Sequence, residues 1–400
     1  MSFKIRIIVF IAFCTLIFGA CAAHRAQEVV PTPIHQAREE IPEEQLLDVG
    51  ILVFESEELT EEEAEEQGTN LEIRKAEGHF IPYHLKNTLH QSSHWGAIQV
   101  VPSESHSVDL MVRGKIHKSN GRNLMVEIDV VDATGKSWWN KWYVEEAFQS
   151  FYSGNKPGEK DAFQDLYDTI ANDMAAFKGQ LTPSEIENIR LVSKLQFAED
   201  YAPYAFDGYL TKEGEDSLVI NRLPADGDPM MDRLLKIGER EYMFLDVLNQ
   251  YYGSLYNEMW DPYESWRRLN LTELKAMEKV KRDALTRQII GALLVVGAVA
   301  AASSDSRVAA NLSPVVAIIG GQIFIDGYNI SKQAEIHAAA IEELSASFGG
   351  QMEPVIMEFE GKRYELTGTA EQQYKRLREL LREIYREETG FDQEGQSGAL

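Results

Sequence analysis

The chain has 400 residues, of which 44% are hydrophobic and 10% aromatic, so it is long enough to bury a large core and to fold as two or three units. It carries 39 lysines and arginines against 64 aspartates and glutamates, which gives a formal net charge of -25. A surface this acidic repels phosphate backbones and anionic lipid head groups. The composition therefore argues against nucleic-acid binding and against a polybasic membrane patch.

Residues 1–21 have the pattern of an export signal. Two basic residues stand near the start, residues 7–18 form an apolar run interrupted by one threonine, and two small residues precede Cys21. The apolar run is shorter than the roughly 20 residues that span a bilayer, and no stop-transfer flank follows it. We therefore expect this segment to be cleaved rather than retained as a membrane span.

The end of this segment resembles the lipoprotein box of bacterial lipoproteins, in which apolar and small residues precede the cysteine that carries the lipid. Phe18 stands where that family most often has leucine. The resemblance implies that Cys21 becomes a diacylated amino terminus. Ala22, rather than aspartate, implies sorting to the outer membrane of a Gram-negative envelope, with the folded part on the periplasmic face. The alternative is an ordinary secretory signal that contains a cysteine by chance.

Cysteine usage bears on both stability and chemistry. The only cysteines are Cys14, inside the expected signal, and Cys21, so the mature protein has no pair for a disulfide although its expected compartment is oxidising. No free thiol remains as a nucleophile, and the sequence has no dinucleotide-binding glycine motif, nucleophile elbow or zinc-protease motif. We therefore expect a protein that is not an enzyme and that holds no cofactor or metal.

The mature chain is expected to begin with a tether and a small α/β domain. Residues 22–47 contain three prolines and several glutamates without a periodic apolar face, which predicts a disordered tether. Residues 48–152 show buried, helical and alternating apolar patterns in the order β-α-β-β-β. The expected elements are a strand at 48–54, a helix around 79–91, a strand at 97–101, and two alternating strands joined by a turn at 120–121, with another turn at 132–135 before residues 136–144.

This element order resembles the amino-terminal domain of TolB-type periplasmic proteins and the periplasmic domain of curli secretion lipoproteins. The likeness is carried by the opening strand VGILVF (residues 49–54), the helix leading to Trp95, and the strand 97–101 before Pro102. It covers a quarter of the chain. It implies a periplasmic α/β domain for recognition or assembly, and it implies no catalytic residues.

Residues 153–348 are expected to form a larger helical domain. An apolar stripe runs along residues 163–177, and Thr182-Pro-Ser-Glu185 is a capping box that opens the next helix. Further helix starts are predicted at Asp228-Pro229 and at Asp261-Pro262, with another cap at Asn270. Short connections between these helices favour a bundle of antiparallel neighbours.

The most apolar part of the mature chain lies within this helical domain. Residues 289–302 have no polar side chain, residues 308–325 are nearly as apolar, and small residues recur four apart in both runs. Small residues at this spacing permit close helix packing. We expect an apolar helical hairpin at 289–325 that is buried in the bundle or in a homo-oligomer. Insertion into a membrane is the alternative.

The carboxyl-terminal part is predicted to be a β-hairpin plus helix at 349–390, followed by a disordered tail at 391–400. Glu360-Gly361 marks the turn of the hairpin, and Tyr374, Leu377, Leu381 and Ile384 form an apolar stripe along the helix. Together these patterns predict an α+β fold: a small β-α-β-β-β domain, a helical domain with the apolar hairpin, and this last unit.

Three groups of residues suggest chemistry and have a simpler explanation. Gly135-Lys136-Ser137 ends like a phosphate-binding loop but lacks the first glycine, so we interpret it as a turn. His90 and His94 have the spacing of a metal pair on one helix face, yet no third ligand is placed by spacing, and hydrogen-bonded or surface histidines are favoured. The remaining group, an aromatic set on a strand and on helices, either fills gaps between layers or binds sugar rings: Trp138, Trp139, Trp142, Tyr143, Tyr251, Tyr252, Tyr256, Trp260, Tyr263 and Trp266.

On strict strand alternation, Trp138 and Trp142 face away from Trp139 and Tyr143, so one of these pairs would be exposed. Taken together, the patterns predict a lipid-anchored envelope protein that acts as a non-enzymatic scaffold or assembly factor. Its expected partners are the membrane, through the lipid, and a second copy or another envelope protein. A cell-wall glycan-binding protein or a cell-wall enzyme is the alternative.

Overall fold

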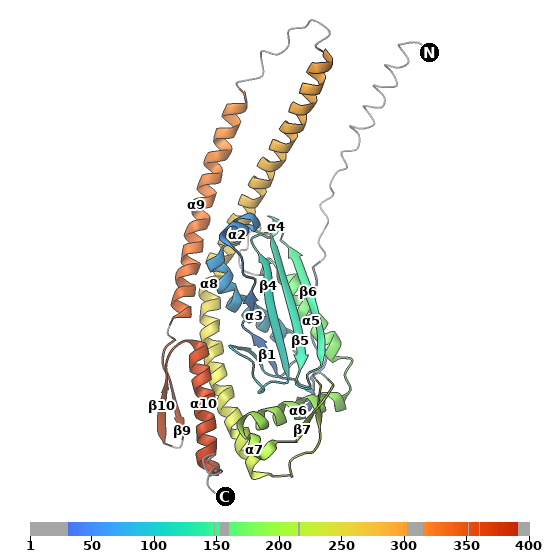
Figure 1. Ribbon diagram of the computed structural model, residues 1–400, viewed down its shortest axis with the longest axis vertical. Coiled ribbons are helices and arrows are strands. Elements are labelled where there is room, and N and C mark those ends of the chain that lie inside the picture. Colours follow the sequence, from blue (N-terminus) through green and yellow to red (C-terminus); the bar gives the residue numbers. More distant parts are fainter. Residues whose placement is uncertain are drawn as a thin grey trace, which may run out of the picture. The chain divides into compact units, whose positions relative to one another are not determined.

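The computed structural model describes residues 31–147, 149–152, 160–214, 217–301, 315–350, 352–359 and 361–390. The fold is mixed α+β, with a six-stranded sheet first, a helical region next and a β-hairpin plus helix last (Figure 1). Residues from Ile34 onward form one compact unit. This architecture confirms the fold class that the sequence predicts.

The sheet has the strand order β3-β1-β4-β5-β6, and the short β2 also pairs with β4. Strand β1 is parallel to β3 and β4, whereas β4, β5 and β6 form an antiparallel meander. Alternation of buried and half-buried residues along β5 fits a sheet with one fully covered face. The strands are β1 (Val49–Leu52), β2 (Glu55–Ser56), β3 (Ile98–Val101), β4 (Leu110–Ser119), β5 (Asn123–Asp132) and β6 (Ser137–Glu146).

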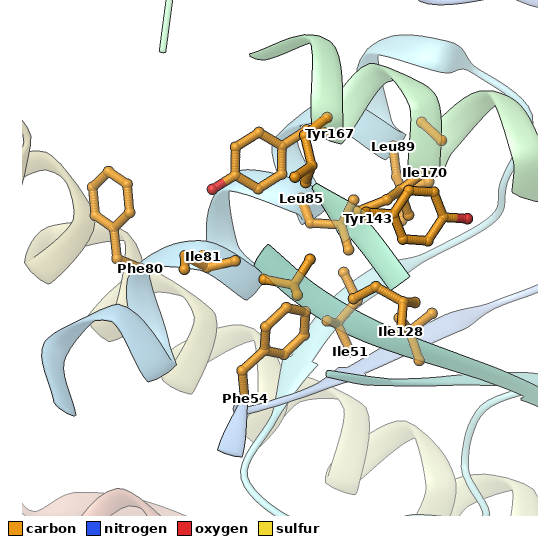
Figure 2. Close-up of a cluster of buried hydrophobic side chains, with 14 of the residues drawn as sticks. Ile51, Phe54, Phe80, Ile81, Leu85, Leu89, Ile128, Tyr143, Tyr167 and Ile170 are labelled. Atoms are coloured by element: carbon orange, nitrogen blue, oxygen red, sulfur yellow. The ribbon is translucent and has the colours of Figure 1, made fainter. Parts of the chain in front are cut away.

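Helices α3 (Leu71–Ser92) and α5 (Gln164–Lys178) cover one face of this sheet. Asn70 is the N-cap of α3, and its side chain accepts hydrogen bonds from the backbone amides of Glu72 and Ile73. The predicted stripe of α5 is buried against α3 and the sheet. Figure 2 shows this core, in which the following side chains gather: Ile51, Leu85, Leu89, Ile128, Tyr143, Tyr167 and Ile170.

In the first part of the helical region α5 packs on α3 and the sheet, whereas α6 packs against α7 and α8, so these helices do not form the predicted bundle. This part contains α4 (Gln149–Tyr152), α5, α6 (Pro183–Tyr201) and α7 (Pro203–Phe206). Earlier in the chain, between β2 and α3, the acidic stretch forms the short helix α2 (Glu61–Gln67). The predicted capping box is present at the start of α6, with Thr182 and Glu185 bonding reciprocally. A small hairpin of β7 (Leu210–Glu213) and β8 (Ser217–Ile220), which the helical pattern does not predict, follows α7.

The helix breaks predicted after residue 259 and at Asn270 are wrong, because α8 runs without interruption from Pro229 to Ala301. Met259, Tyr263 and Trp266 continue its buried face across the proline at 262, so tertiary packing outweighs the local stop signal. The Asn270 side chain does not cap a helix. It donates to the carbonyl of Gly68, 2.8 Å away, at the end of α2.

The structure describes the two helical arms of the predicted apolar hairpin at 289–325. Helix α8 reaches Ala301, α9 (Val315–Gly349) begins after it, and the two helices contact each other (Figure 1). Residues 302–314 lie outside the described residues, so self-association through the hairpin stays a prediction. Within the part of the chain that is described, no helix combines the length and apolarity needed to cross a membrane.

The carboxyl-terminal prediction is confirmed in detail. Strands β9 (Val355–Phe359) and β10 (Lys362–Leu366) pair as an antiparallel hairpin, and α10 (Ala370–Thr389) follows. The four residues of the predicted stripe on α10 are buried in a second core, which α10 shares with α6, the first half of α8 and β3. The predicted tail at 391–400 lies outside the described residues.

The predicted tether is ordered in its second half. Leu47 is fully buried, the backbone amide of Ala37 donates to the Ser92 carbonyl at 2.9 Å, and Arg190 donates to the Glu43 carbonyl at 2.7 Å. A single turn of 3-10 helix, Glu43–Gln45, lies in this stretch. These contacts satisfy backbone groups that the composition alone would leave to solvent. Residues 22–30 lie outside the described residues.

The predicted domain boundary at 152 does not coincide with a boundary of the core. Phe163 and Tyr263 belong to the same buried cluster as Val112 and Ile128 of the sheet. The turn between β4 and β5 also touches α8 directly, because a Cβ added to Gly121 would lie 1.8 Å from the Arg267 carbonyl oxygen. Whether residues 48–152 fold alone stays a prediction, and such a fragment would expose this shared core.

Replacing Asp261 with alanine tests the continuity of α8. In a continuous helix the exposed Asp261 is an interior residue, and alanine is the better helix former, so the free energy of unfolding should stay equal or rise by a few tenths of a kcal/mol. Thr182→Ala removes a true N-cap and should cost about 1 kcal/mol. Urea denaturation monitored by circular dichroism measures both. A loss for Asp261→Ala as large as that for Thr182→Ala would indicate a helix start at residue 262.

Candidate functional site

An apolar groove of about 420 Å³ lies between α6 and the first half of α8. Phe197 lines it from α6, and Ser107 and its neighbour His106 reach it from the connection between β3 and β4. The other wall is a row of α8 residues: Met231, Leu234, Leu235, Gly238, Glu239, Tyr242 and Met243. The groove is thus built from two helices and one loop that lie far apart in the sequence.

The α8 wall of this groove leaves large apolar side chains in solvent. Leu235, Tyr242 and Met243 are 46%, 40% and 54% exposed. Residues at these spacings lie on one face of a helix, so the exposed groups form a stripe rather than scattered positions. Rimmed apolar patches of this kind mark interaction sites on soluble proteins.

A buried carboxylate beneath the groove holds its walls together. Glu241 of α8 has 0% exposure and accepts hydrogen bonds from Tyr201 of α6 at 2.6 Å and from Tyr374 of α10 at 2.5 Å. Ser105, beside the loop wall of the groove, donates to it at 3.2 Å. The Arg378 Nε atom lies 3.7 Å from a Glu241 oxygen. One side chain therefore joins α6, α8, α10 and the loop.

The electrostatics of this cluster fix the direction of its hydrogen bonds. Burial, and then the Glu241 carboxylate, raise the pKa values of Tyr201 and Tyr374 above the ordinary tyrosine value. Both hydroxyls therefore stay protonated and donate to the carboxylate. Hydrogen bonds to a charged group contribute about 1.5–3 kcal/mol each, which offsets the cost of burying the charge.

A buried ion pair to Asp161 and a buried hydrogen bond to α3 also fasten α8 to the rest of the fold. Arg267 makes a bidentate contact with Asp161, with nitrogen–oxygen distances of 3.1 and 2.5 Å, and both side chains are almost completely buried. Glu77 of α3 accepts from Tyr263 at 2.5 Å and pairs with Arg74 at 3.1 Å. These groups are engaged in structural contacts rather than presented to a ligand.

The edge of the sheet at β3 is closed by α8. The Asn249 side chain accepts from the Val100 amide at 2.9 Å and donates to the Val100 carbonyl at 3.0 Å, as a neighbouring strand would. Gln99 donates to Asp246 at 3.0 Å. These contacts occupy the backbone groups of Val100 that an added strand would need, so strand addition is disfavoured at the β3 edge.

The histidines that the sequence pairs as candidate metal ligands do not form a site, whereas Tyr256 and Trp260 of the predicted aromatic set contact each other, with 5.5 Å between ring centroids. Cys21 lies outside the described residues, and its lipidation stays a prediction. Helix α3 ends at Ser92, so His90 and His94 do not share a helix face, and His90 is exposed. Among the described residues no group of three His, Cys, Asp or Glu side chains could hold a metal ion. The turn at Gly135, with a φ of 84°, closes as an ordinary hydrogen-bonded turn.

The alternation predicted for the β6 aromatics is wrong at Trp138. The pairing register shifts between Val130 and Val131, so β6 carries a bulge that turns Trp138 into the core, where it stacks on Phe177 at 4.6 Å between ring centroids. Tyr143 is also buried, and Trp142 is 51% exposed. The strand therefore exposes Trp142 rather than one of the two predicted pairs.

The residues that shape the groove carry little signal in the sequence. Glu241 lies in a charged helical stretch, where a glutamate normally faces solvent. The sequence signals the groove in one way: α8 has more apolar residues than its buried face requires, because Leu235 and Met243 lie outside the set of α8 residues buried in the core. Comparison with known proteins gives no matching family model, no matching curated protein and no matching solved structure.

Replacing Glu241 with alanine should lower the free energy of unfolding by about 3–5 kcal/mol, because the buried hydroxyls of Tyr201 and Tyr374 lose their acceptor at about 1–3 kcal/mol each, whereas Arg378 keeps its pair with Asp200. Glu239→Ala, two residues away on the exposed side of α8, is the matched control and should change stability by less than about 0.5 kcal/mol. Urea unfolding of both variants gives the comparison. Equal, small effects would contradict the role assigned to Glu241.

Proposed function

We propose that this protein is a lipid-anchored scaffold or assembly factor on the periplasmic face of the outer membrane. It has no enzymatic activity and docks an amphipathic helix of a partner protein in the groove between α6 and α8. The observation that carries the proposal is the exposed apolar stripe of Leu235, Tyr242 and Met243 along that groove. The export signal, Cys21 and the resemblance to TolB-type periplasmic domains supply the expected location.

A helix suits the groove for geometric reasons. The lining of α8 extends from Met231 to Met243, a rise of about 18 Å, which matches roughly three turns of a partner helix. Two helices with an apolar depression between them form the surface into which a third helix packs with its own apolar stripe. Methionines at both ends of this wall adapt their shape to different side chains.

The charge of the chain indicates the polar face of the partner. A formal net charge of -25 favours a helix whose outward side carries lysine and arginine. The same charge disfavours acidic helices and anionic membranes as occupants. Association with such a partner should be fastest at low salt, because dissolved ions screen the attraction between the acidic surface and the basic helix as the ionic strength rises.

The first test concerns the anchor. Replacing Cys21 with serine removes the sulfur to which the lipid would be attached, and acyl chains contribute about 0.8 kcal/mol of membrane affinity per buried methylene. We expect the Cys21→Ser protein in the soluble periplasmic fraction, whereas Cys14→Ser should leave the protein in the membrane fraction. If Cys21→Ser remains with the membrane, the lipid anchor is excluded.

The second test concerns the groove and uses a defined probe. A fluorescent helical peptide of about 14 residues, roughly four turns, with leucine on one face and lysine on the other, should bind the mature protein. Leu235→Asp and Met243→Asp place a charge in the apolar stripe and should each weaken binding at least tenfold, about 1.4 kcal/mol. Fluorescence anisotropy measures the dissociation constants.

Leu223→Asp is the matched control for this experiment. Leu223 is 58% exposed and does not line the groove, so the variant adds the same negative charge elsewhere and should bind the peptide unchanged. Equal binding by all three variants would show attraction to the acidic surface alone and would overturn the docking site. A dimer in sedimentation that Leu235→Asp dissociates would identify a second copy as the occupant instead.

A further inference from the structure

A second cavity, of about 470 Å³, opens between α3 and α8 beside the start of α5. Its size lies within the range of small-molecule sites. Two rows of side chains line it. Asn87 and Gln91 stand one turn apart on α3, and Tyr256 and Trp260 stand one turn apart on α8, so each pair shares a helix face. The cavity thus has a carboxamide row on one helix and an aromatic row on the other.

A buried histidine orients the aromatic row. His84, 5% exposed, lies 2.7 Å from the Tyr256 hydroxyl through Nδ1 and 2.9 Å from the Gln164 amide oxygen through Nε2. The Gln164 amide nitrogen donates to Asp168 at 2.9 Å, which fixes the orientation of that amide. Burial lowers the pKa of His84, so the neutral ring donates from Nε2 and accepts the hydroxyl proton of Tyr256 at Nδ1.

This network also supports Trp260, and it leaves Gln91 exposed at the cavity. The ring of His84 stacks on Trp260 with 5.8 Å between centroids and an interplanar angle of 20°. Tyr256, Trp260 and Asn87 are half-buried, and Gln91 is exposed. The aromatic rings are therefore held in place from behind, whereas the amide groups reach the opening of the cavity.

The chemistry of the two rows matches a sugar more closely than an ion or a purely apolar ligand. A pyranose ring presents an apolar face of C–H groups to an aromatic ring and polar groups around its edge. Carboxamides both donate and accept, so they pair reciprocally with an acetamido group. Asp161 and Lys160 also line the cavity. Arg267 neutralises the Asp161 carboxylate and Lys160 is exposed, so the described lining holds no buried, unpaired charge that would select an ion.

We propose that this cavity is a binding site for a saccharide that carries N-acetylhexosamine units, with Tyr256 and Trp260 as the stacking platform and Asn87 and Gln91 as the groups that recognise the acetamido substituent. Gln164 and His84 are positioning residues. The site is separate from the α6–α8 groove and does not depend on a partner helix. It gives the protein a second ligand, of the chemical class found in cell-wall glycans.

The test uses the mature protein and two tetrasaccharides that differ only in the group at issue. Isothermal titration calorimetry should detect chitotetraose, which carries acetamido groups, and much weaker binding of cellotetraose, which has hydroxyls in their place. The double variant Asn87→Ala/Gln91→Ala should weaken chitotetraose binding at least tenfold. Gln91 is exposed, whereas Asn87 is half-buried and hydrogen-bonds to Tyr256, so circular dichroism checks that the variant is folded before its affinity is compared.

Gln250→Ala is the matched control, because Gln250 is an exposed carboxamide on α8 outside the cavity, and it should bind chitotetraose as the wild type does. Three results overturn the proposal. These are no heat of binding at millimolar chitotetraose, equal binding of the two sugars, and unchanged affinity in a folded Asn87→Ala/Gln91→Ala protein. None of them bears on peptide binding in the α6–α8 groove.

Discussion

The structure depends on the continuity of α8 across residues 259–270. The first half of this helix supplies Leu248 and its neighbours to the core shared with α6 and α10, and the next turns supply Met259 and Tyr263 to the core under the sheet. Because one rigid element contributes to both cores, neither core is complete without the other. The groove and the second cavity both use α8 as a wall, so this helix also fixes where both candidate sites lie.

Buried charges select this arrangement among the many ways in which apolar helices can pack. Glu241, Glu77 and the Asp161–Arg267 pair each bond to groups on other elements, and each would lose its partners if α8 slipped by one turn. Such pairs add little net stability over apolar residues of similar volume, but a wrong register leaves a charge buried and unpaired. We infer that they specify the register of α8, whereas the apolar contacts provide most of the stabilisation.

The sequence predicts the parts of this fold that depend on local patterns. Alternation in the sheet, the capping box at Thr182 and the stripe of α10 are confirmed because neighbouring residues determine them. The prediction fails where distant packing decides. The proline at 262 lies inside a helix whose face is buried on both sides of it, and Trp138 is turned inward by a bulge that depends on the partner strand. The groove is hidden for the same reason, since Glu241 gains its role only through partners from other elements.

Hydrogen exchange of α8 followed by mass spectrometry tests the continuity of this helix most directly. If one helix joins the two cores, the amides from residue 255 to 270 should be protected as strongly as those from 244 to 255, and both stretches should open together in global unfolding. The contrary result is fast exchange confined to residues 259–264, with separate opening of the two flanking stretches. That result would mean two helices and two independent cores, and it would contradict the common wall assigned to the groove and the saccharide cavity.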